Sequence, residues 1–278
     1  MSKIPPKLYH YCSIESFYKI INSQSIWLSN SSQLNDSKES VWIERYFDSI
    51  EEKFSEKKYG NIFEIALQVY EWNKRPPFVF CFSRKKDSLS QWRAYSDDGH
   101  GVAIGFSTKI LNLSQDFPVR NVSADRSISL NEVEYRFDNQ KKIVTNICER
   151  FIELYENTEY SSNVGYFLGT ILVKYSLIFK NKSFAAESEW RIIHTPSTED
   201  YSIPSDTEKI LSKRSFVLKG NKIVSYYDYS LKDKFKTDLI KEIVLGPKCE
   251  MTEIEIYDFL KANNLKDTKI SISKSTYR

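Results

Sequence analysis

The stretch Phe78-Val-Phe-Cys-Phe-Ser83 is apolar and rich in aromatic and β-branched side chains. It has the length and composition of a buried strand, and Val102-Ala-Ile-Gly-Phe106 is a second stretch of this kind. Further strand-like segments lie near residues 8–12, 25–29, 132–135, 187–193, 216–218, 222–226, 240–245 and 270–273. Helical patterns fall between them at irregular intervals. This order predicts an α+β fold with a mostly antiparallel sheet rather than a doubly wound parallel sheet.

Helical periodicity is concentrated in two long stretches, near residues 38–75 and 139–181. The first of them ends before Pro76-Pro77, as expected for a helix. We find no internal repeat and no linker rich in Pro, Gly or Ser. The sequence therefore predicts a single domain over residues 1–278, with helical insertions near 38–75 and 139–181.

The composition is that of an ordinary globular protein. The 278 residues include 40 Lys and Arg against 37 Asp and Glu, so a net charge of +3 gives no general attraction to nucleic acid or anionic lipid. No run approaches the roughly 20 apolar residues of a membrane helix, and the first residues lack the apolar core of a signal peptide. We expect a cytoplasmic protein with no membrane partner. Its four cysteines are far apart, which predicts buried thiols rather than disulfides or a zinc cluster.

The segment Glu187-Ser-Glu-Trp-Arg191 is the sharpest candidate for chemistry. In a strand, alternation places Glu187, Glu189 and Arg191 on one face. Two carboxylates so close together repel each other, which raises the pKa of one of them, whereas the arginine favours the ionised form. The segment is either a functional carboxylate pair or, as is commoner for a bare Glu-x-Glu, an exposed strand face with ion pairs.

Two further features can recognise a ligand. His10 lies between Tyr9 and Tyr11, and a neutral imidazole that donates and accepts one hydrogen bond each suits a ribose hydroxyl. Trp92 and Tyr95 lie one helical turn apart, so they share a face and can stack on a base or nicotinamide. Each feature also has an ordinary interpretation, because a partly buried histidine and an aromatic pair in the core are both common.

Several well-known site motifs are missing from the sequence. There is no phosphate-binding G-x-x-x-x-G-K-[ST] loop, no dinucleotide-binding G-x-G-x-x-G, no H-E-x-x-H and no G-x-S-x-G. Three scattered histidines make a catalytic zinc site unexpected. P-loop phosphoryl transfer, Rossmann-type redox chemistry and α/β-hydrolase chemistry therefore have little support.

Taken together, these segments resemble the bacterial domain-of-unknown-function family 2971. The resemblance runs almost from end to end, in the family's order. The segments that carry it are Leu8-Tyr-His-Tyr11, Leu34-Asn-Asp36 with Glu39, Cys81-Phe-Ser83, Trp92-x-x-Tyr95, His100-Gly-Val-Ala-Ile-Gly-Phe106, Glu187-x-Glu-Trp-Arg191 and Ser275-x-Tyr-Arg278. Ser37 departs from the pattern, since the family often has proline there.

That family in turn looks like a distant relative of the ADP-ribosyltransferases that have a histidine in the first core strand and a glutamate in a late one. The resemblance implies a split, antiparallel-rich sheet that binds NAD in its cleft. It implies that His10 holds a ribose hydroxyl, that Glu189 occupies the catalytic position and that Glu187 orients the acceptor. The middle-strand Ser or Tyr of such enzymes has three candidates: Ser29, Ser83 and Tyr95.

The implied chemistry fits these residue types. Breaking the nicotinamide–ribose bond develops oxocarbenium charge, which a carboxylate near the 2′-hydroxyl stabilises. Arg191 or Arg93 can pair with the pyrophosphate, because a planar guanidinium matches two oxygens at once. Tyr11, Trp92 and Tyr95 are the aromatic candidates for contact with NAD. NAD is then a substrate, and no metal is expected.

The leading hypothesis is an enzyme that cleaves NAD and transfers ADP-ribose to a protein or nucleic acid, as a bacterial toxin or phage-defence effector with an antitoxin or inhibitor partner. Plain NAD hydrolysis is a variant. One alternative is a non-catalytic module that binds a nucleotide or nucleic acid. Another is a metal-dependent nuclease, whose candidate ligands would be Asp36, Glu39, Asp97 and Asp98. The leading hypothesis requires His10 and Glu189 to line one cleft, and it leaves open which of the two glutamates is essential.

Overall fold

The structure is a computed structural model, and the residues described are 3–33, 41–74, 76–116, 128–157, 163–196 and 210–277. The chain forms two compact units. The first comprises Met1–Asn30, Phe78–Glu132 and Ala186–Arg278, and the second comprises Ser31–Pro77 and Val133–Ala185. The two stretches of the second unit contain the helical insertions expected near 38–75 and 139–181. That the whole chain folds as one domain stays a prediction.

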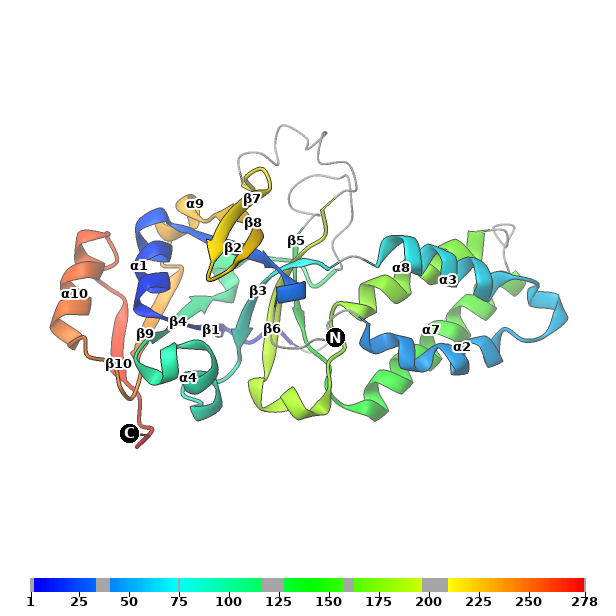
Figure 1. Ribbon diagram of the computed structural model, residues 1–278, viewed down its shortest axis with the longest axis horizontal. Helices are drawn as coiled ribbons and strands as arrows, with labels where there is room; N and C mark the ends of the chain where they lie inside the picture. The colour runs from blue at the N-terminus through cyan, green and yellow to red at the C-terminus, as the bar shows by residue number, and fades with distance from the viewer. Residues whose placement is uncertain are drawn as a thin grey trace. The chain divides into compact units, whose positions relative to one another are not determined.

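The first unit is built around a ten-stranded sheet (Figure 1). Its main path runs β10-β9-β4-β1-β3-β2-β8-β7. In that order the strands span Lys269–Ile272, Ile240–Leu245, Val102–Ser107, Lys7–Cys12, Phe78–Ser83, Ser25–Asn30, Lys222–Ser230 and Ser215–Lys219. The other two strands, β5 (Ile128–Glu132) and β6 (Glu189–His194), pair with each other, and β6 also pairs with β3. Among these described pairs only β9–β10 is parallel. The predicted mixed fold with a mostly antiparallel sheet is confirmed.

The sheet divides at β3. Along one edge, β3 pairs with β6 over its whole length. Along the other edge, β2 pairs only with the beginning of β3, where Ser29 lies opposite Val79. At the end of β3 this edge is taken by β1, where Tyr9 lies opposite Ser83. Thus β1 and β2 diverge from the middle of β3, and the sheet is open between them.

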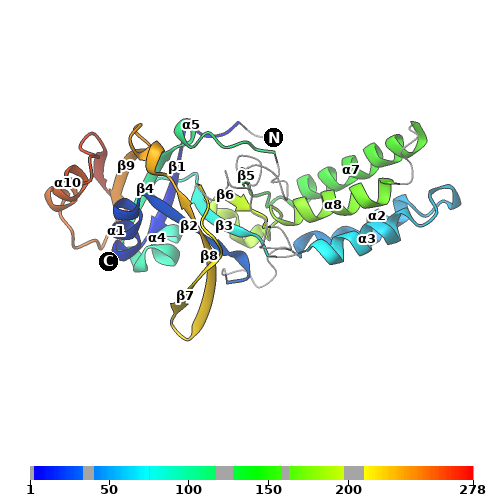
Figure 2. The ribbon, with the colours of Figure 1, turned by 90° about the horizontal axis from the view of Figure 1, so that it is seen from above.

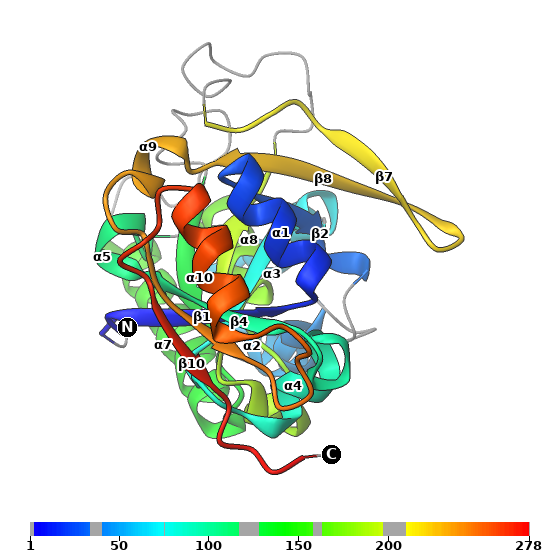
Figure 3. The same ribbon diagram turned by 90° about the vertical axis from the view of Figure 1, so that its left-hand side faces the viewer.

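The main core of the first unit lies on one face of this sheet. Its strand residues include Leu8, Phe80 and Ile104, and two amphipathic helices cover them. These are α1 (Ile14–Ser23) and α10 (Glu253–Ala262), which lie side by side in Figure 3. Both helices begin at a capping side chain, as Ser13 accepts from the Ser16 amide at 3.2 Å and Thr252 forms a capping box with Glu255. Two short helices, α5 (Thr108–Leu111) and α9 (Lys232–Phe235), also belong to this unit.

The opposite face of the sheet carries α4 (Leu89–Tyr95) and a smaller apolar cluster. Tyr9 and Tyr11 of β1 pack there with the buried Trp92 of α4. The 3₁₀ turn η4 (Asp97–Gly99) follows α4, and η6 (Lys182–Glu187) precedes β6. The polar residues considered below lie on this second face.

The second unit is helical. Its described helices are α2 (Phe47–Lys53), α3 (Ile62–Asn73), α7 (Phe137–Asn157) and α8 (Val164–Ser176), with short turns η1 (Ser31–Gln33), η2 (Trp42–Tyr46) and η3 (Lys57–Tyr59). Figure 2 shows α3 and α8 side by side. Two glycines permit this approach, because a Cβ added at Gly169 would lie 2.4 Å from the Ala66 carbonyl oxygen and one at Gly165 would lie 2.8 Å from that of Ile62.

Some sequence predictions fall outside the described residues. These are the turn at Leu34–Ser37 with Asp36, together with Glu39 and Arg278. The four cysteines are free thiols, and Cys12 and Cys148 are buried as predicted, whereas Cys81 and Cys249 are only half-buried. Within the described part of the chain, no helix is both long and apolar enough to cross a membrane.

Candidate functional site

The register of three strands defines a polar face of the sheet. Tyr9 of β1 lies opposite Ser83 of β3, which lies opposite Glu189 of β6. Cys81 lies opposite Arg191 in the neighbouring row. Directly opposed residues of antiparallel strands point to the same side. These five residues therefore share the face that carries α4, and we call this the polar face.

Glu189 and Arg191 form a buried ion pair on the polar face. Their exposed fractions are 5% and 1%. Arg191 donates from Nε to Oε1 of Glu189 at 2.7 Å and from Nη2 to Oε2 at 2.9 Å. Two parallel, charge-assisted hydrogen bonds are the strongest geometry available to such a pair. The predicted alternation is confirmed for these two residues. The alternative of an exposed strand face is wrong for them, because both side chains are buried and their opposite charges pair with each other.

Glu187 lies outside β6, so a hydrogen bond of its side chain, not strand pairing, fixes its position. Ser188 has a left-handed backbone (φ 48°), so β6 begins only at Glu189. The half-buried Glu187 accepts at Oε1 from the hydroxyl of Tyr95 at 2.6 Å. Burial, this hydrogen bond and the nearby charge of Glu189 all raise the pKa of Tyr95. Tyr95 therefore stays a neutral donor, and it lies beside both carboxylates of the predicted pair.

Ser83 fixes the turn that carries Glu187. Its hydroxyl donates to the Glu187 carbonyl at 2.6 Å and accepts from the Lys85 amide at 3.1 Å. The Arg84 amide donates to the Ser188 carbonyl at 2.9 Å. Ser83 is almost fully buried. Ser83 therefore holds the backbone of Glu187 in place, and its hydroxyl makes two hydrogen bonds within the protein.

Trp92 and Tyr11 belong to the core beneath α4. Trp92 is 0% exposed, and its indole donates to Asp87 Oδ1 at 2.6 Å. Its ring meets that of Tyr11 at 4.7 Å, nearly edge-on. The Tyr11 hydroxyl donates to the Lys85 carbonyl at 2.8 Å, and burial raises the pKa of Tyr11. The stacking role predicted for Trp92 is not compatible with this burial, because no face of its ring is open. Of the predicted aromatic pair, Tyr95 alone reaches the surface.

His10 extends to the other face of the sheet. Its ring stacks on Phe80 with centroids 3.9 Å apart, and Phe80 belongs to the main core. Its Nδ1 lies 2.8 Å from the Cys81 carbonyl oxygen, so this contact joins β1 to β3. Burial lowers the pKa of His10 to about 4, so the ring is neutral at pH 7 and Nδ1 is the donor. The structure therefore does not bring His10 and Glu189 to a common face. The first-strand residues on the side of Glu189 are Lys7, Tyr9 and Tyr11.

Ser29 lies on the polar face, but on the far arm of the split. It is opposite Val79 of β3 and Tyr226 of β8. Val79 is four residues along β3 from Ser83, and the strand rises about 3.3 Å per residue. Ser29 is therefore separated by the opening of the sheet from the row that contains Glu189. Of the three candidates for the middle-strand position, Tyr95 is the one that contacts a predicted carboxylate.

Residues 91–192 match the family model described as protein of unknown function DUF2971. This match supports the family predicted from the sequence over these residues. The DUF2971 segment contains Tyr95, Glu187, Glu189 and Arg191, the residues that meet on the polar face. No curated protein and no solved structure matches the chain.

The acidic turn after α4 is occupied by contacts within the protein. Asp98 accepts from Lys248 Nζ at 2.7 Å and from the Tyr277 hydroxyl at 2.9 Å, while the His100 ring bonds the Asp97 carbonyl at 2.8 Å. Among the residues that the structure describes, no cluster of three His, Cys, Asp or Glu side chains is arranged to hold a metal ion. Asp36 and Glu39, the other candidate metal ligands, lie outside those residues.

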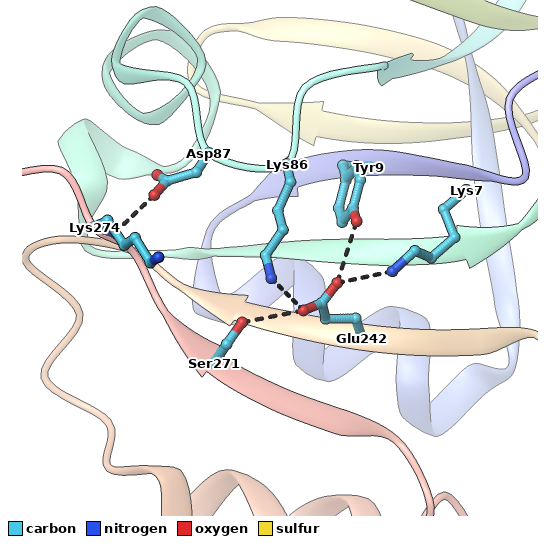
Figure 4. Close-up of polar contacts among 7 residues, drawn as sticks. All are labelled: Lys7, Tyr9, Lys86, Asp87, Glu242, Ser271 and Lys274. Carbon is cyan, nitrogen blue, oxygen red and sulfur yellow. Dashed lines mark hydrogen bonds and ion pairs between the residues drawn. The ribbon is translucent and has the colours of Figure 1, made fainter.

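Sequence reasoning missed a buried acidic centre on the polar face, which lies outside the DUF2971 match. Glu242 of β9 has a side chain only 2% exposed, and it accepts from Lys7, Tyr9, Lys86 and Ser271 (Figure 4). Burial alone would raise the pKa of Glu242, but hydrogen bonds and charge from the two lysines lower it to about 2. The available signal was the position of Glu242 in a predicted strand, directly before the apolar residues Ile243-Val-Leu245. We call this group the Glu242 cluster.

Proposed function

We propose that the chain is an NAD-cleaving enzyme of the ADP-ribosyltransferase type. Such an enzyme breaks the bond between C1′ of the ribose and the nicotinamide nitrogen, and transfers ADP-ribose to a macromolecule. The observation that supports this proposal best is the meeting of Glu187, Glu189 and Tyr95 at one end of β6, on an antiparallel sheet that opens beside β3. A split sheet with a late-strand glutamate is what the resemblance to ADP-ribosyltransferases implies.

The two carboxylates take different parts in this proposal. Glu189 is buried against Arg191, so its charge is already opposed and its oxygens are held. Glu187 is half-buried and is oriented by the Tyr95 hydroxyl. We assign Glu187 to the reacting ribose, where its negative charge would stabilise the developing oxocarbenium ion. Glu189 with Arg191 is assigned to hold the end of β6 in place.

The bond changes can be written in full. The C1′–nicotinamide bond breaks, and nicotinamide leaves with the electron pair as a neutral molecule. A nucleophile of the acceptor then bonds to C1′ and loses its proton to a carboxylate, for which Glu187 is the candidate. If water replaces the acceptor, the same steps give NAD hydrolysis. His10 has no part in this scheme, because it extends to the opposite face.

The direct test is release of nicotinamide from NAD by the purified protein, with labelled NAD used to detect ADP-ribose on bacterial protein or RNA. Glu187→Gln should lower turnover by about 100-fold or more, as expected when preorganised charge is lost from a reacting centre. Glu253→Gln on the surface of α10 is the matched control, and His10→Ala should keep turnover if it folds. Full activity in Glu187→Gln would reject this site, and no nicotinamide release by the wild type would reject the function.

A consequence for the cell follows from the same proposal. If the acceptor is an essential protein or RNA in the bacterial cytoplasm, expression of the wild-type chain should slow growth, whereas Glu187→Gln should not. This outcome would support a role as a toxin or defence effector that is held in check by an inhibitor protein.

One observation favours a second candidate, a non-catalytic nucleotide-binding module. The pairing of Glu189 with Arg191 neutralises the most deeply buried carboxylate of the site. A carboxylate that is paired with an arginine in this way is also expected in a site that only binds a ligand or only stabilises the fold. Calorimetric binding of NAD without any nicotinamide release would favour the module over the enzyme. Binding to RNA that weakens steeply with salt would identify a nucleic-acid ligand instead.

A further inference from the structure

The segment Ser273–Tyr277, which follows β10, is fastened to the loop before α4. Asp87 of this loop accepts at Oδ1 from the Ser273 hydroxyl at 2.6 Å and at Oδ2 from the Lys274 amide at 2.7 Å. Figure 4 shows Asp87 beside Lys274. Oδ1 also accepts from the indole of Trp92 at 2.6 Å. One carboxylate therefore joins the loop, the segment and the middle of α4, and these hydrogen bonds lower its pKa although burial opposes them.

A second fastening lies at the other end of α4. The Tyr277 hydroxyl donates to Asp98 Oδ1 at 2.9 Å, and Lys248 Nζ lies 4.0 Å from the Tyr277 ring centroid. The guanidinium of Arg93, in the last turn of α4, lies 5.6 Å from the same ring. Cations at such distances over an aromatic ring are attracted to its face. The segment is therefore held to the residues just before and just after α4, and its Tyr277 lies near Arg93 within the helix.

These contacts matter because α4 is short. It spans seven residues, and Ser88 at its beginning makes no side-chain capping bond. A helix of this length has little stability of its own, so its position depends on what it packs against. Tyr95 is its last residue and donates to Glu187. Any movement of α4 would be passed directly to this hydrogen bond.

We propose that Asp87 is a positioning residue. Together with the segment Ser273–Tyr277, it fixes the position of α4 so that the Tyr95 hydroxyl orients Glu187. Its bearing on turnover rests on the function proposed above. Asp87 does not itself reach the carboxylates of the site. Asp87 acts through Trp92 and α4. Replacing Asp87 should therefore affect Glu187 only through the hydrogen bond from Tyr95.

Hydrogen exchange tests the positioning without any assay of activity. In Asp87→Asn and in Tyr277→Ala, amides of residues 91–96 and 186–189 should exchange at least about tenfold faster than in the wild type, while those of α1 stay unchanged. Asp238→Asn is the matched control, because this exposed aspartate, in the turn that precedes β9, pairs with Lys241. Unchanged exchange at 91–96 in both variants would overturn the proposal.

A double variant tests whether the effect passes through Tyr95. In a Tyr95→Phe background, Asp87→Asn should cause no further increase in exchange at residues 186–189, and it should cause no further loss of turnover. Asp87→Asn alone should lower kcat with KM for NAD unchanged. Losses that simply add in the double variant would overturn the proposal. If the wild type releases no nicotinamide, the proposed function fails, and the exchange of residues 186–189 still decides whether Asp87 positions them.

Discussion

Replacing Glu242 by glutamine removes the negative charge that pairs with Lys7 and Lys86 in the Glu242 cluster. The carboxylate accepts hydrogen bonds from both lysines, from Tyr9 and from Ser271. Glutamine has nearly the same size, but it is neutral, and its amide nitrogen is a donor where each carboxylate oxygen accepts from a lysine. We expect Glu242→Gln to be clearly less stable than the wild type at pH 7.

The size of the effect follows from the pKa of Glu242. The lysines hold it at about 2 against an ordinary value of 4.5, even though burial opposes this. At 1.36 kcal/mol per pH unit, that difference corresponds to about 3 kcal/mol of stability. Because the side chains of both lysines are 41% exposed, solvent screens part of the attraction, and we take about 2 kcal/mol. A carboxyl pKa lowered by folding adds stability above pH 4.5, and this stability is lost as the pH falls toward 2.

Urea unfolding followed by tryptophan fluorescence measures this difference. The gap in unfolding free energy between wild type and Glu242→Gln should be about 2 kcal/mol at pH 7 and should shrink by more than half at pH 3. Glu250→Gln, at an exposed position, should show neither effect. A gap that is the same at both pH values would refute the reasoning, because the charge of Glu242 would then contribute nothing.

Three further predictions concern the fold. Gly169→Ala should lower the stability of the helical unit by about 1–2 kcal/mol in thermal unfolding, since the new Cβ would lie 2.4 Å from the Ala66 carbonyl oxygen, whereas Tyr166→Ala on the exposed side of α8 should change little. His10 should titrate near pH 4 in NMR, so that its burial costs stability as the pH falls from about 6.5 toward 4; a midpoint near 6.5 would show that the ring is solvated. Thr252→Ala should cost about 1 kcal/mol in urea unfolding through loss of the capping box of α10, and a cost near zero would contradict the capping role.

Local patterns were enough to find much of the secondary structure. The apolar stretch at 78–83 is β3, and the one expected at 102–106 is β4, one residue longer. The helix expected at 88–95 begins one residue later. These elements are set by side chains that are adjacent in sequence. The strand expected at 132–135 is instead at Ile128–Glu132. There the apolar Ile128 and Leu130 alternate with polar residues, and the segment pairs with β6.

The faces of the sheet were harder to predict, because they depend on pairing between distant residues. Alternation correctly placed Glu189 and Arg191 together, since both belong to one strand. Whether His10 or its neighbour Tyr9 shares their face depends on the register of β1 with β3, which joins residues more than 70 positions apart. A change of register by one residue exchanges the two faces. The resemblance supplied a role for His10 that this register does not permit.

The burial of Glu189 changes which variant tests catalysis fairly. Breaking a buried ion pair by removing one partner typically costs about 3–5 kcal/mol, because the other charge stays enclosed. Glu189→Gln would leave the guanidinium of Arg191, 1% exposed, without this carboxylate. Loss of activity in Glu189→Gln could therefore result from loss of folding as well as from loss of a catalytic group. Glu187 is half-buried, so its replacement by glutamine carries a smaller desolvation cost and still removes a charge beside Tyr95. Turnover lost in Glu187→Gln at unchanged unfolding free energy would assign the chemistry to this carboxylate.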